Sequence, residues 1–116
     1  MRDNQKKTPR GRFSHHSLRV WGEALRLVQV VHSHRIDDAE LRNQAMRASR
    51  SVALNVAEAS ALCGGNRRRH FSITRGSVVE TVAAYELAEA IGEKVPVCEV
   101  RRLGAAISAM LFSLVR

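Results

Sequence analysis

Apolar residues recur along this chain at steps of three and four positions, which is the spacing of one face of an α-helix. The first such stretch follows Ser14 and Ser17, either of which can cap a helix N-terminus, and it continues to about Arg35. Its apolar positions are Leu18, Trp21, Ala24, Leu25, Leu27, Val28 and Val31. The sequence therefore predicts a first amphipathic helix that begins after one of these serines.

A second helix is predicted after an acidic segment. Asp37, Asp38 and Glu40 suit the positive end of a helix dipole, and Leu41 is the first core residue that follows. Small and apolar residues continue at helical spacing at Ala45, Ala48, Val52, Val56, Ala59 and Leu62. The segment Cys63-Gly64-Gly65-Asn66 is expected to end this helix, because glycine adopts the left-handed cap conformation easily.

The same spacing predicts two more helices. The third extends from near Arg67 to about Ile91, and Gly92 ends it. Its inner face consists of Phe71, Thr74, Val78, Thr81, Val82, Tyr85 and Ala88. Pro96 suits the first turn of a fourth helix, since a missing N–H group costs little there. The apolar positions of that helix are Val97, Val100, Leu103, Ile107, Leu111 and Leu114.

Four helices of about 18 to 26 residues with short connections predict an all-α fold, namely an up-down-up-down antiparallel four-helix bundle. No segment sustains a period-two alternation of apolar and polar residues, so no sheet is expected. Residues 1–13 are charged, contain Pro9 and Gly11 and lack periodicity, which predicts a flexible basic N-terminal tail. The bundle domain is therefore expected to cover 14–116.

Polar residues interrupt the apolar pattern in the second and third helices. Ser51, Asn55 and Glu58 are spaced by four and three, so they form one stripe on a helix. A buried polar group needs a partner, because leaving it unpaired costs about 1–3 kcal/mol. The expected partners are Ser77 and Glu80 on the third helix. The whole predicted structural cluster is Arg47, Arg50, Ser51, Asn55, Glu58, Arg75, Ser77 and Glu80.

These polar residues give little support for catalysis. Two carboxylates such as Glu58 and Glu80 are able to do acid–base work when they are paired. Ion pairs with Arg47, Arg50 or Arg75 explain them better than a catalytic pair does. A structural role for this cluster is therefore expected, and no enzymatic activity.

Metal and cofactor sites are likewise not expected. His32 and His34 point about 200° apart on a helix, so they cannot share a metal ion. Cys63 and Cys98 have no partner at metal-ligand spacing. The pair Gly64-Gly65 is too short for a phosphate-binding loop and indicates a helix end.

The chain carries a formal net charge of +8 and has a sequence pI near 11.0. This balance favours a polyanionic partner such as RNA, DNA or an acidic protein face, although basic surface also serves solubility alone. The candidate nucleic-acid-binding residues are Arg67, Arg68, Arg69, Lys6, Lys7, Arg10 and Arg12, with His70 beside the arginine run. Aromatic residues are few and most fall on core faces, so binding is expected through backbone phosphates.

The arginine run lies where a helix dipole disfavours it. Arg67, Arg68 and Arg69 crowd the start of the third helix, and acidic residues crowd its end at Glu86, Glu89 and Glu93. Each well-placed charge is typically worth about 0.3–1 kcal/mol at a helix end. A bound anion or an acidic patch on a neighbouring subunit would explain the run, and so would exposed arginines screened by salt.

Neither a membrane span nor a secretory signal is expected. No stretch of 18 apolar residues occurs, and no apolar segment follows the basic residues at the start of the chain. Cys63 and Cys98 are interpreted as reduced thiols rather than a disulfide framework. The predicted location is therefore cytoplasmic.

The polar clusters also carry a family resemblance. The matching segments are Leu18-Arg19-Val20-Trp21 with Ala24, then Leu41 and Gln44, then Arg47 to Glu58, and finally Phe71 and Arg75-Gly76-Ser77-Val78 with Glu80. In these segments the chain resembles the four-helix bundle proteins encoded in intervening sequences of bacterial 23S ribosomal RNA genes. The same family includes the accessory variability determinant proteins of diversity-generating retroelements. The resemblance covers about Phe13 to Ile91.

The resemblance implies a small cytosolic bundle without enzymatic activity that assembles as a homopentamer. It also implies a basic surface suited to nucleic acid and, for the retroelement members, binding to a reverse transcriptase. Ala59 and Thr74 depart from the glycine and alanine that are common at these positions, which affects local packing. Two functions remain open: a nucleic-acid-binding protein, or a protein-interaction scaffold such as a reverse-transcriptase accessory subunit.

Overall fold

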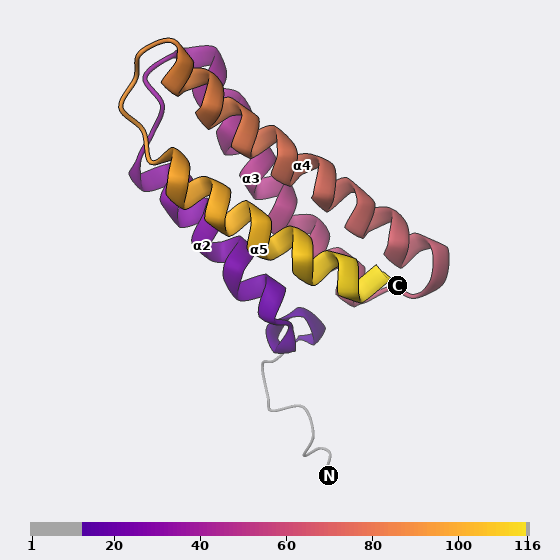
Figure 1. The fold of residues 1–116 in the computed structure, drawn as a ribbon. Helices are drawn as coiled ribbons and strands as arrows, with labels where there is room; N and C mark the ends of the chain where they lie inside the picture. The colour runs from indigo at the N-terminus through magenta and orange to yellow at the C-terminus, as the bar shows by residue number, and fades with distance from the viewer. Residues whose placement is uncertain (1–12, 116) are drawn as a thin grey trace.

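The computed structural model describes residues 13–115, and all regular structure in that range is helical. A short 3₁₀ helix, η1 (Ser14–Ser17), precedes α2 (Arg19–Ser33), α3 (Ala39–Ser60), α4 (Gly64–Ala90) and α5 (Val97–Val115). Each helix contacts the next one in sequence, and α2 also contacts α5, so the four α-helices close into a bundle (Figure 1). The predicted all-α bundle is confirmed. The predicted tail residues Lys6, Lys7, Arg10 and Arg12 lie outside the described residues.

The first helix begins later than its apolar pattern indicates. Leu18 is the N-cap residue of α2 and makes no side-chain capping bond, so the prediction that Ser14 or Ser17 caps this helix is wrong. The hydroxyl of Ser17 instead donates to the carbonyl oxygen of Ser14 at 3.1 Å, within the 3₁₀ turn. The helix also ends at Ser33, two residues before Arg35.

The connection between α3 and α4 differs from the prediction too. Helix α3 ends at Ser60, and α4 begins at Gly64 rather than near Arg67. Gly64 has a φ of 61°, a left-handed conformation that glycine adopts without strain. The glycine pair therefore starts the next helix, whereas the sequence analysis used it only to end the previous one.

The start of α3 follows the acidic signal in the sequence. The side chain of Asp38 caps the helix by accepting a hydrogen bond from the backbone N–H of Leu41 at 3.0 Å. Arg42 holds the preceding loop, since its guanidinium donates to the carbonyl oxygens of Ile36 and Asp37. These contacts fix the turn between α2 and α3.

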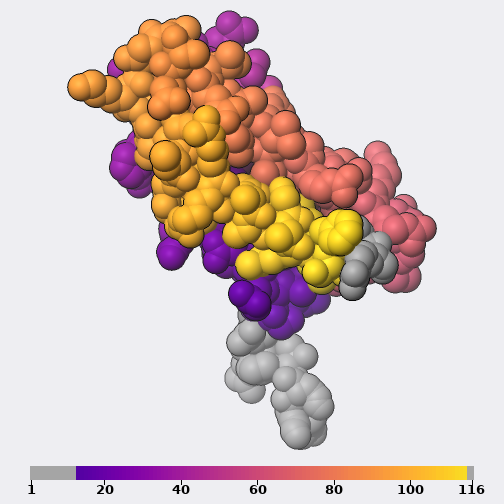
Figure 2. All heavy atoms as spheres, in the orientation of Figure 1, coloured from indigo at the N-terminus to yellow at the C-terminus, as the bar shows by residue number. Residues whose placement is uncertain are grey.

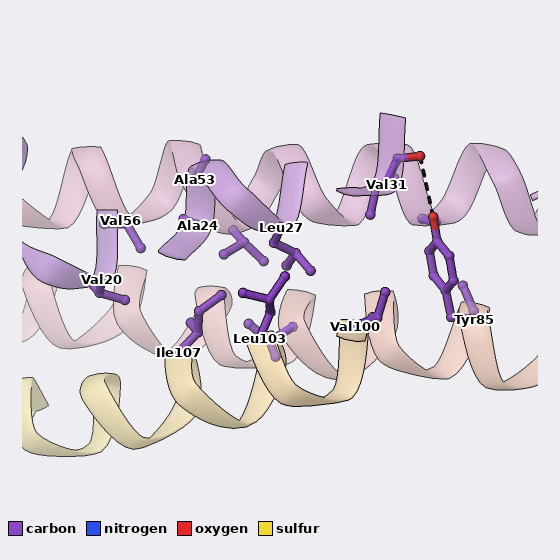
Figure 3. Close-up of a cluster of buried hydrophobic side chains, with 14 of the residues drawn as sticks. Val20, Ala24, Leu27, Val31, Ala53, Val56, Tyr85, Val100, Leu103 and Ile107 are labelled. Atoms are coloured by element: carbon purple, nitrogen blue, oxygen red, sulfur yellow. Dashed lines mark hydrogen bonds between the residues drawn. The ribbon is translucent and has the colours of Figure 1, made fainter. Parts of the chain in front are cut away.

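The core lies where one stripe from each helix meets the bundle axis. Figure 3 shows Ala24 and Leu27 of α2 pointing toward Leu103 and Ile107 of α5. Leu25 was predicted to belong to this inner face, but 40% of it is exposed. It follows Ala24 by one residue, which is about 100° around a helix, so the two cannot share one narrow stripe.

Tyr85 adds a polar link inside the core. Its hydroxyl donates to the carbonyl oxygen of His34 at 2.8 Å and lies 3.4 Å from that of Val31 (Figure 3). Both carbonyls belong to the C-terminal end of α2, where backbone oxygens have no partner within the helix. Burial raises the pKa of Tyr85 to about 12.

Helices α4 and α5 approach each other closely at Gly104. A Cβ atom on this residue would lie 2.9 Å from a methyl carbon of Val82 and 3.3 Å from one of Val78. Both distances are shorter than ordinary van der Waals contact, so a side chain at this position would force the two helices apart. Gly104 therefore sets the spacing between α4 and α5.

Candidate functional site

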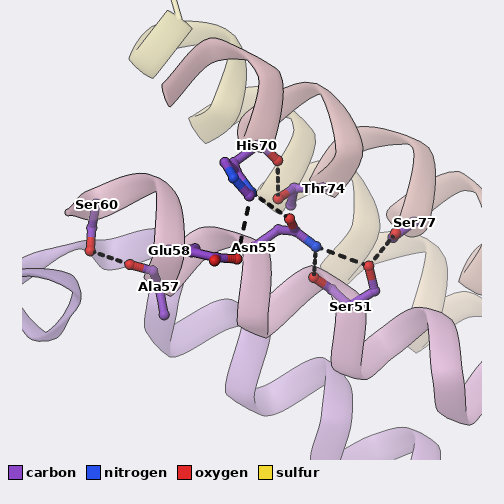
Figure 4. A network of polar contacts seen from close by, with 8 residues as sticks. All are labelled: Ser51, Asn55, Ala57, Glu58, Ser60, His70, Thr74 and Ser77. Atoms are coloured by element: carbon purple, nitrogen blue, oxygen red, sulfur yellow. Dashed lines mark hydrogen bonds and ion pairs between the residues drawn. The ribbon is translucent and has the colours of Figure 1, made fainter. Parts of the chain in front are cut away.

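The predicted polar stripe lies along the contact between α3 and α4. The hydroxyl oxygens of Ser51 and Ser77 are 2.8 Å apart and share a hydrogen bond (Figure 4). The amide nitrogen of Asn55 donates to the carbonyl oxygen of Ser51 at 2.9 Å and lies 3.1 Å from its hydroxyl. The structure thus places Ser51, Asn55 and Ser77 in one continuous network.

His70 is the member of this network that the sequence analysis missed. Its Nδ1 atom lies 2.8 Å from Oδ1 of Asn55 and 3.7 Å from a carboxylate oxygen of Glu58 (Figure 4). The Asn55 amide nitrogen is already bonded to a carbonyl, so Oδ1 is the atom that faces His70. An amide oxygen can only accept, which means that Nδ1 of His70 carries the proton in this arrangement.

A signal for His70 was present in the sequence. His70, Thr74 and Ser77 are spaced by four and three, so they form a stripe on α4 that matches the stripe on α3. The hydroxyl of Thr74 donates to the carbonyl oxygen of His70 at 2.9 Å. His70 was instead predicted to act with the neighbouring arginines as charge directed at phosphate, and this interpretation overlooked its helical spacing to Thr74 and Ser77.

The charged residues of the predicted cluster do not lie together in the structure. Arg47 lies 3.5 Å from the carboxylate of Glu80, and both side chains are largely exposed. Such a surface pair is worth about 0–1 kcal/mol. Arg50 instead points toward α2, where its guanidinium lies 3.5 Å from Nε2 of His32. Arg75 is exposed on the side of α4 that faces α5, so the structure brings neither Arg50 nor Arg75 to the network.

Glu58 pairs with a histidine, His70, rather than with an arginine as predicted. Its side chain is 65% exposed, and no group of three or more potential metal ligands gathers anywhere in the described part of the chain. Within residues 13–115, no helix is long and apolar enough to cross a membrane. The network therefore holds two helices together.

Arg67 serves the end of the neighbouring helix. Its guanidinium donates to the carbonyl oxygen of Ala59 at 3.3 Å, in the last turn of α3. Its Cζ atom lies 5.0 Å from the ring centre of Phe71, a cation–π distance. Positive charge stabilises a helix C-terminus, so Arg67 suits α3 although it lies near the start of α4.

Glu93 does the same at the other end of these two helices. Its two carboxylate oxygens accept hydrogen bonds from the backbone N–H groups of Asp37 and Asp38, at 2.8 and 2.9 Å. These N–H groups precede the first turn of α3, where negative charge is favourable. The charges that are unfavourable for α4 itself therefore stabilise its antiparallel neighbour.

Arg68 and Arg69 remain as exposed members of the arginine run. Neither forms an ion pair with another described residue. They lie at the end of the bundle where α3 meets α4, in the second turn of α4. The opposite end is rich in carboxylates, which are Asp37, Asp38, Glu40, Glu86, Glu89, Glu93 and Glu99. These carboxylates offset the cationic residues of that end, such as Arg35 and Lys94, so the arginine end carries the more positive net charge.

A shallow apolar groove lies between α4 and α5. It has a volume of about 270 Å³ and is lined by Val78, Val79, Val82, Ala83, Glu86, Arg101, Gly104, Ala105 and Ser108. Figure 2 shows this face of the molecule, with α5 alongside α4. Val79 is 64% exposed, and a second hollow continues past it toward Arg75 and Gly76. Arg101 and Glu86 form an ion pair across the groove at 2.8 Å, which raises the pKa of Arg101.

Comparison with known proteins gives one family. The model of the family described as 23S rRNA-intervening sequence protein matches residues 16–109, which includes all of α2, α3 and α4 and most of α5. The match thus reaches beyond Ile91, where the resemblance seen in the sequence ended. No curated protein matches the chain.

Proposed function

Because the chain belongs to the 23S rRNA-intervening sequence protein family, we propose that it is a non-catalytic, oligomeric bundle protein that binds the phosphate backbone of RNA or DNA. The observation that carries this proposal is the pair Arg68 and Arg69, exposed without an ion-pair partner among the described residues. In sequence, the cationic residues Lys6, Lys7, Arg10 and Arg12 add to this charge. Arg67 contributes less, since it is engaged with α3.

The chemistry of phosphate binding fits these residues. Arginine offers several N–H donors to phosphate oxygens, and each neutralised phosphate releases condensed counterions. The net charge of +8 attracts a polyanion to the whole chain, while the carboxylates at the opposite end repel it. Binding is therefore expected at the arginine end, with strong salt dependence and weak sequence preference.

A charge-reversal experiment tests this proposal. Fluorescence anisotropy of labelled RNA and DNA is measured over a range of salt concentrations for Arg68→Glu with Arg69→Glu. The matched control is Arg35→Glu with Lys94→Glu, which changes net charge equally at the opposite end. The first variant should bind more weakly and lower the salt slope by about two, since each phosphate contact contributes about 0.9. Equal weakening by both variants would contradict the proposal.

The oligomer is proposed to be a homopentamer, as the family resemblance implies, closed through the groove between α4 and α5. An exposed apolar surface of this kind is typical of a protein interface. Val79→Glu would place a charge in the groove and should reduce the mass measured by light scattering. Gln29→Glu adds the same charge on an exposed position of α2 and should leave the mass unchanged. If the unmutated protein had the mass of a single chain, the proposal of a homopentamer would be overturned.

A second candidate function is a protein-interaction scaffold, such as a reverse-transcriptase accessory subunit. Its support is a set of exposed apolar residues outside the groove, which are Ile73 and Leu87 on α4 and Ile91 at its C-cap. Surface of this kind favours a protein partner over a phosphate backbone. Co-purification with a reverse transcriptase, lost in Leu87→Glu, would support this candidate. Phosphate binding without such co-purification would favour the first function.

A further inference from the structure

Aromatic and imidazole rings gather at the start of the described chain. The ring centres of His15 and His16 are 4.4 Å apart, and His15 lies edge-on to Trp21 at 4.5 Å. Phe13 stands edge-on to His16 at 6.1 Å and is 68% exposed. Most aromatic residues were predicted to lie on core faces, and Phe13 is an exception.

Phe13 also borders a hollow on the outer face of α3. The hollow has a volume of about 480 Å³, and its walls are Phe13, Ser14 and His15 on one side and Leu54, Ala57, Glu58 and Ala61 on the other. Leu54 is 66% exposed. A hydrogen bond of 2.9 Å between the hydroxyls of Ser14 and Ser60 holds η1 against α3, so the two walls keep their spacing.

The chemistry of this hollow fits a flat aromatic ligand. A planar ring placed in it would stack on Phe13 and contact the apolar side chain of Leu54. Base–aromatic stacking of this type recognises single-stranded nucleic acid, because every base has a π-face. Paired bases are stacked on one another inside a duplex and cannot enter without being unpaired.

The charges around the hollow agree with this ligand. Phe13 directly follows Arg10, Gly11 and Arg12 in the chain, so cationic residues that attract phosphate are joined to the aromatic wall. Glu58 on the opposite wall repels phosphate, but its carboxylate can accept hydrogen bonds from an exocyclic amine. The chemistry of the hollow thus fits a nucleobase, and the cationic residues that precede Phe13 in the sequence fit the phosphate backbone of a nucleic acid.

We propose that the hollow between η1 and α3 binds an unpaired nucleobase, so that single-stranded nucleic acid is preferred over duplex. This inference rests on the proposed function, because it names the form of nucleic acid that the basic surface takes. The Glu58 carboxylate favours adenine, cytosine and guanine, which carry an exocyclic amine, over uracil, which has none.

The test uses single-stranded RNA and a duplex of the same sequence with the full-length protein. Affinity is measured by anisotropy, and base stacking is followed by quenching of Trp21, the single tryptophan of the chain, which contacts His15. Phe13→Ala should weaken single-strand binding by about five- to a hundredfold and leave duplex binding unchanged. Phe13→Tyr keeps the ring and should restore binding.

Matched variants separate this effect from a general loss of apolar surface. Leu54→Ala removes the other wall and should also weaken single-strand binding, whereas Leu87→Ala, an exposed leucine on α4, should have no effect. Phe13 and Leu54 are both exposed, so these variants should fold like the parent.

Three results have distinct meanings. If neither single strand nor duplex binds at low salt, the proposed function fails together with this inference. If both bind equally well and Phe13→Ala changes neither, the inference alone is overturned. If Phe13→Ala reduces the oligomer mass while single-strand affinity stays the same, a second copy of the chain covers the hollow, and the inference is also overturned.

Discussion

The Nδ1 atom of His70 lies 2.8 Å from Oδ1 of Asn55, and this contact links the C-terminal half of α3 to the first half of α4. The Asn55 amide passes the link on to Ser51, which bonds Ser77 on α4. The two helices are therefore joined at two points, which are four residues apart on α3 and seven residues apart on α4. A shift of either helix along the other would break both contacts, so the network fixes their register.

The network predicts a clear effect of Asn55→Leu. This change leaves His70 without its acceptor and removes a donor from Ser51, and unpaired polar groups of this kind cost about 1–3 kcal/mol. Unfolding in urea should show a loss of that size, with a change in bundle geometry or assembly and no change in helix content by circular dichroism. Asn43→Leu, at an exposed position of α3, serves as the control. Parent-like melting and assembly of Asn55→Leu would contradict the role of the network.

Tyr85 predicts a dependence of stability on alkaline pH. Its pKa is about 12 in the folded protein and 10.0 as the ordinary value, because burial disfavours the phenolate. Folded-state stabilisation by the neutral hydroxyl is fully present below pH 10 and is lost as the pH rises toward 12. The free energy of unfolding should therefore fall over this interval.

Tyr85→Phe provides the comparison for that pH profile. The variant loses the hydrogen bond to His34, which costs about 0.5–1.5 kcal/mol at neutral pH. Its stability should then decline less than that of the parent between pH 10 and 12. Parallel profiles for the two proteins would show that Tyr85 does not titrate in this way.

Substitution by alanine is predicted to have opposite effects on stability at two helical glycines, Gly104 and Gly22. Gly104→Ala would bring a methyl group within 2.9 Å of Val82, and overpacking of this kind costs about 1–3 kcal/mol. Gly22→Ala meets no atom within 4 Å, so it should stabilise α2 by about 0.5–1 kcal/mol. Thermal unfolding of both variants checks the pair. Similar melting temperatures would mean that the close approach of α4 and α5 does not depend on a glycine at position 104.

The contacts of Glu93, which follows α4 in the chain, predict that it stabilises the start of α3. Glu93→Gln removes the negative charge at the N-terminus of α3, and the loss should be about 0.3–1 kcal/mol at low salt. Glu89→Gln is the control, since Glu89 is exposed and has no hydrogen bond to α3 among the described residues. Urea unfolding at low and high salt should show a difference between the two variants that shrinks with salt.

Periodicity in the sequence was sufficient to predict the four helices, because each buries one stripe of apolar residues. Helix ends were less predictable, since they depend on local competition. Ser17 bonds within a 3₁₀ turn and caps nothing, and Gly64 starts a helix because it tolerates a positive φ. These choices depend on backbone geometry that side-chain spacing does not report.

The candidate site was predictable in part, for a similar reason. The contact of Ser51 with Ser77 follows from helical spacing in both segments, and the same spacing would have identified His70. The roles of Arg67 and Glu93 require knowledge of which helix ends lie together. Only the antiparallel arrangement of α3 and α4 shows that a charge unfavourable in one helix is favourable for the other.

The salt dependence of nucleic-acid affinity tests the central claim most directly. Binding of the full-length parent protein to labelled RNA should strengthen as salt is lowered, with a linear plot of log affinity against log salt concentration. The slope should be steeper than about −2, because Arg68, Arg69 and the cationic residues 2–12 together neutralise several phosphates. Absence of binding at low salt, or an affinity that does not change with salt, would contradict the account.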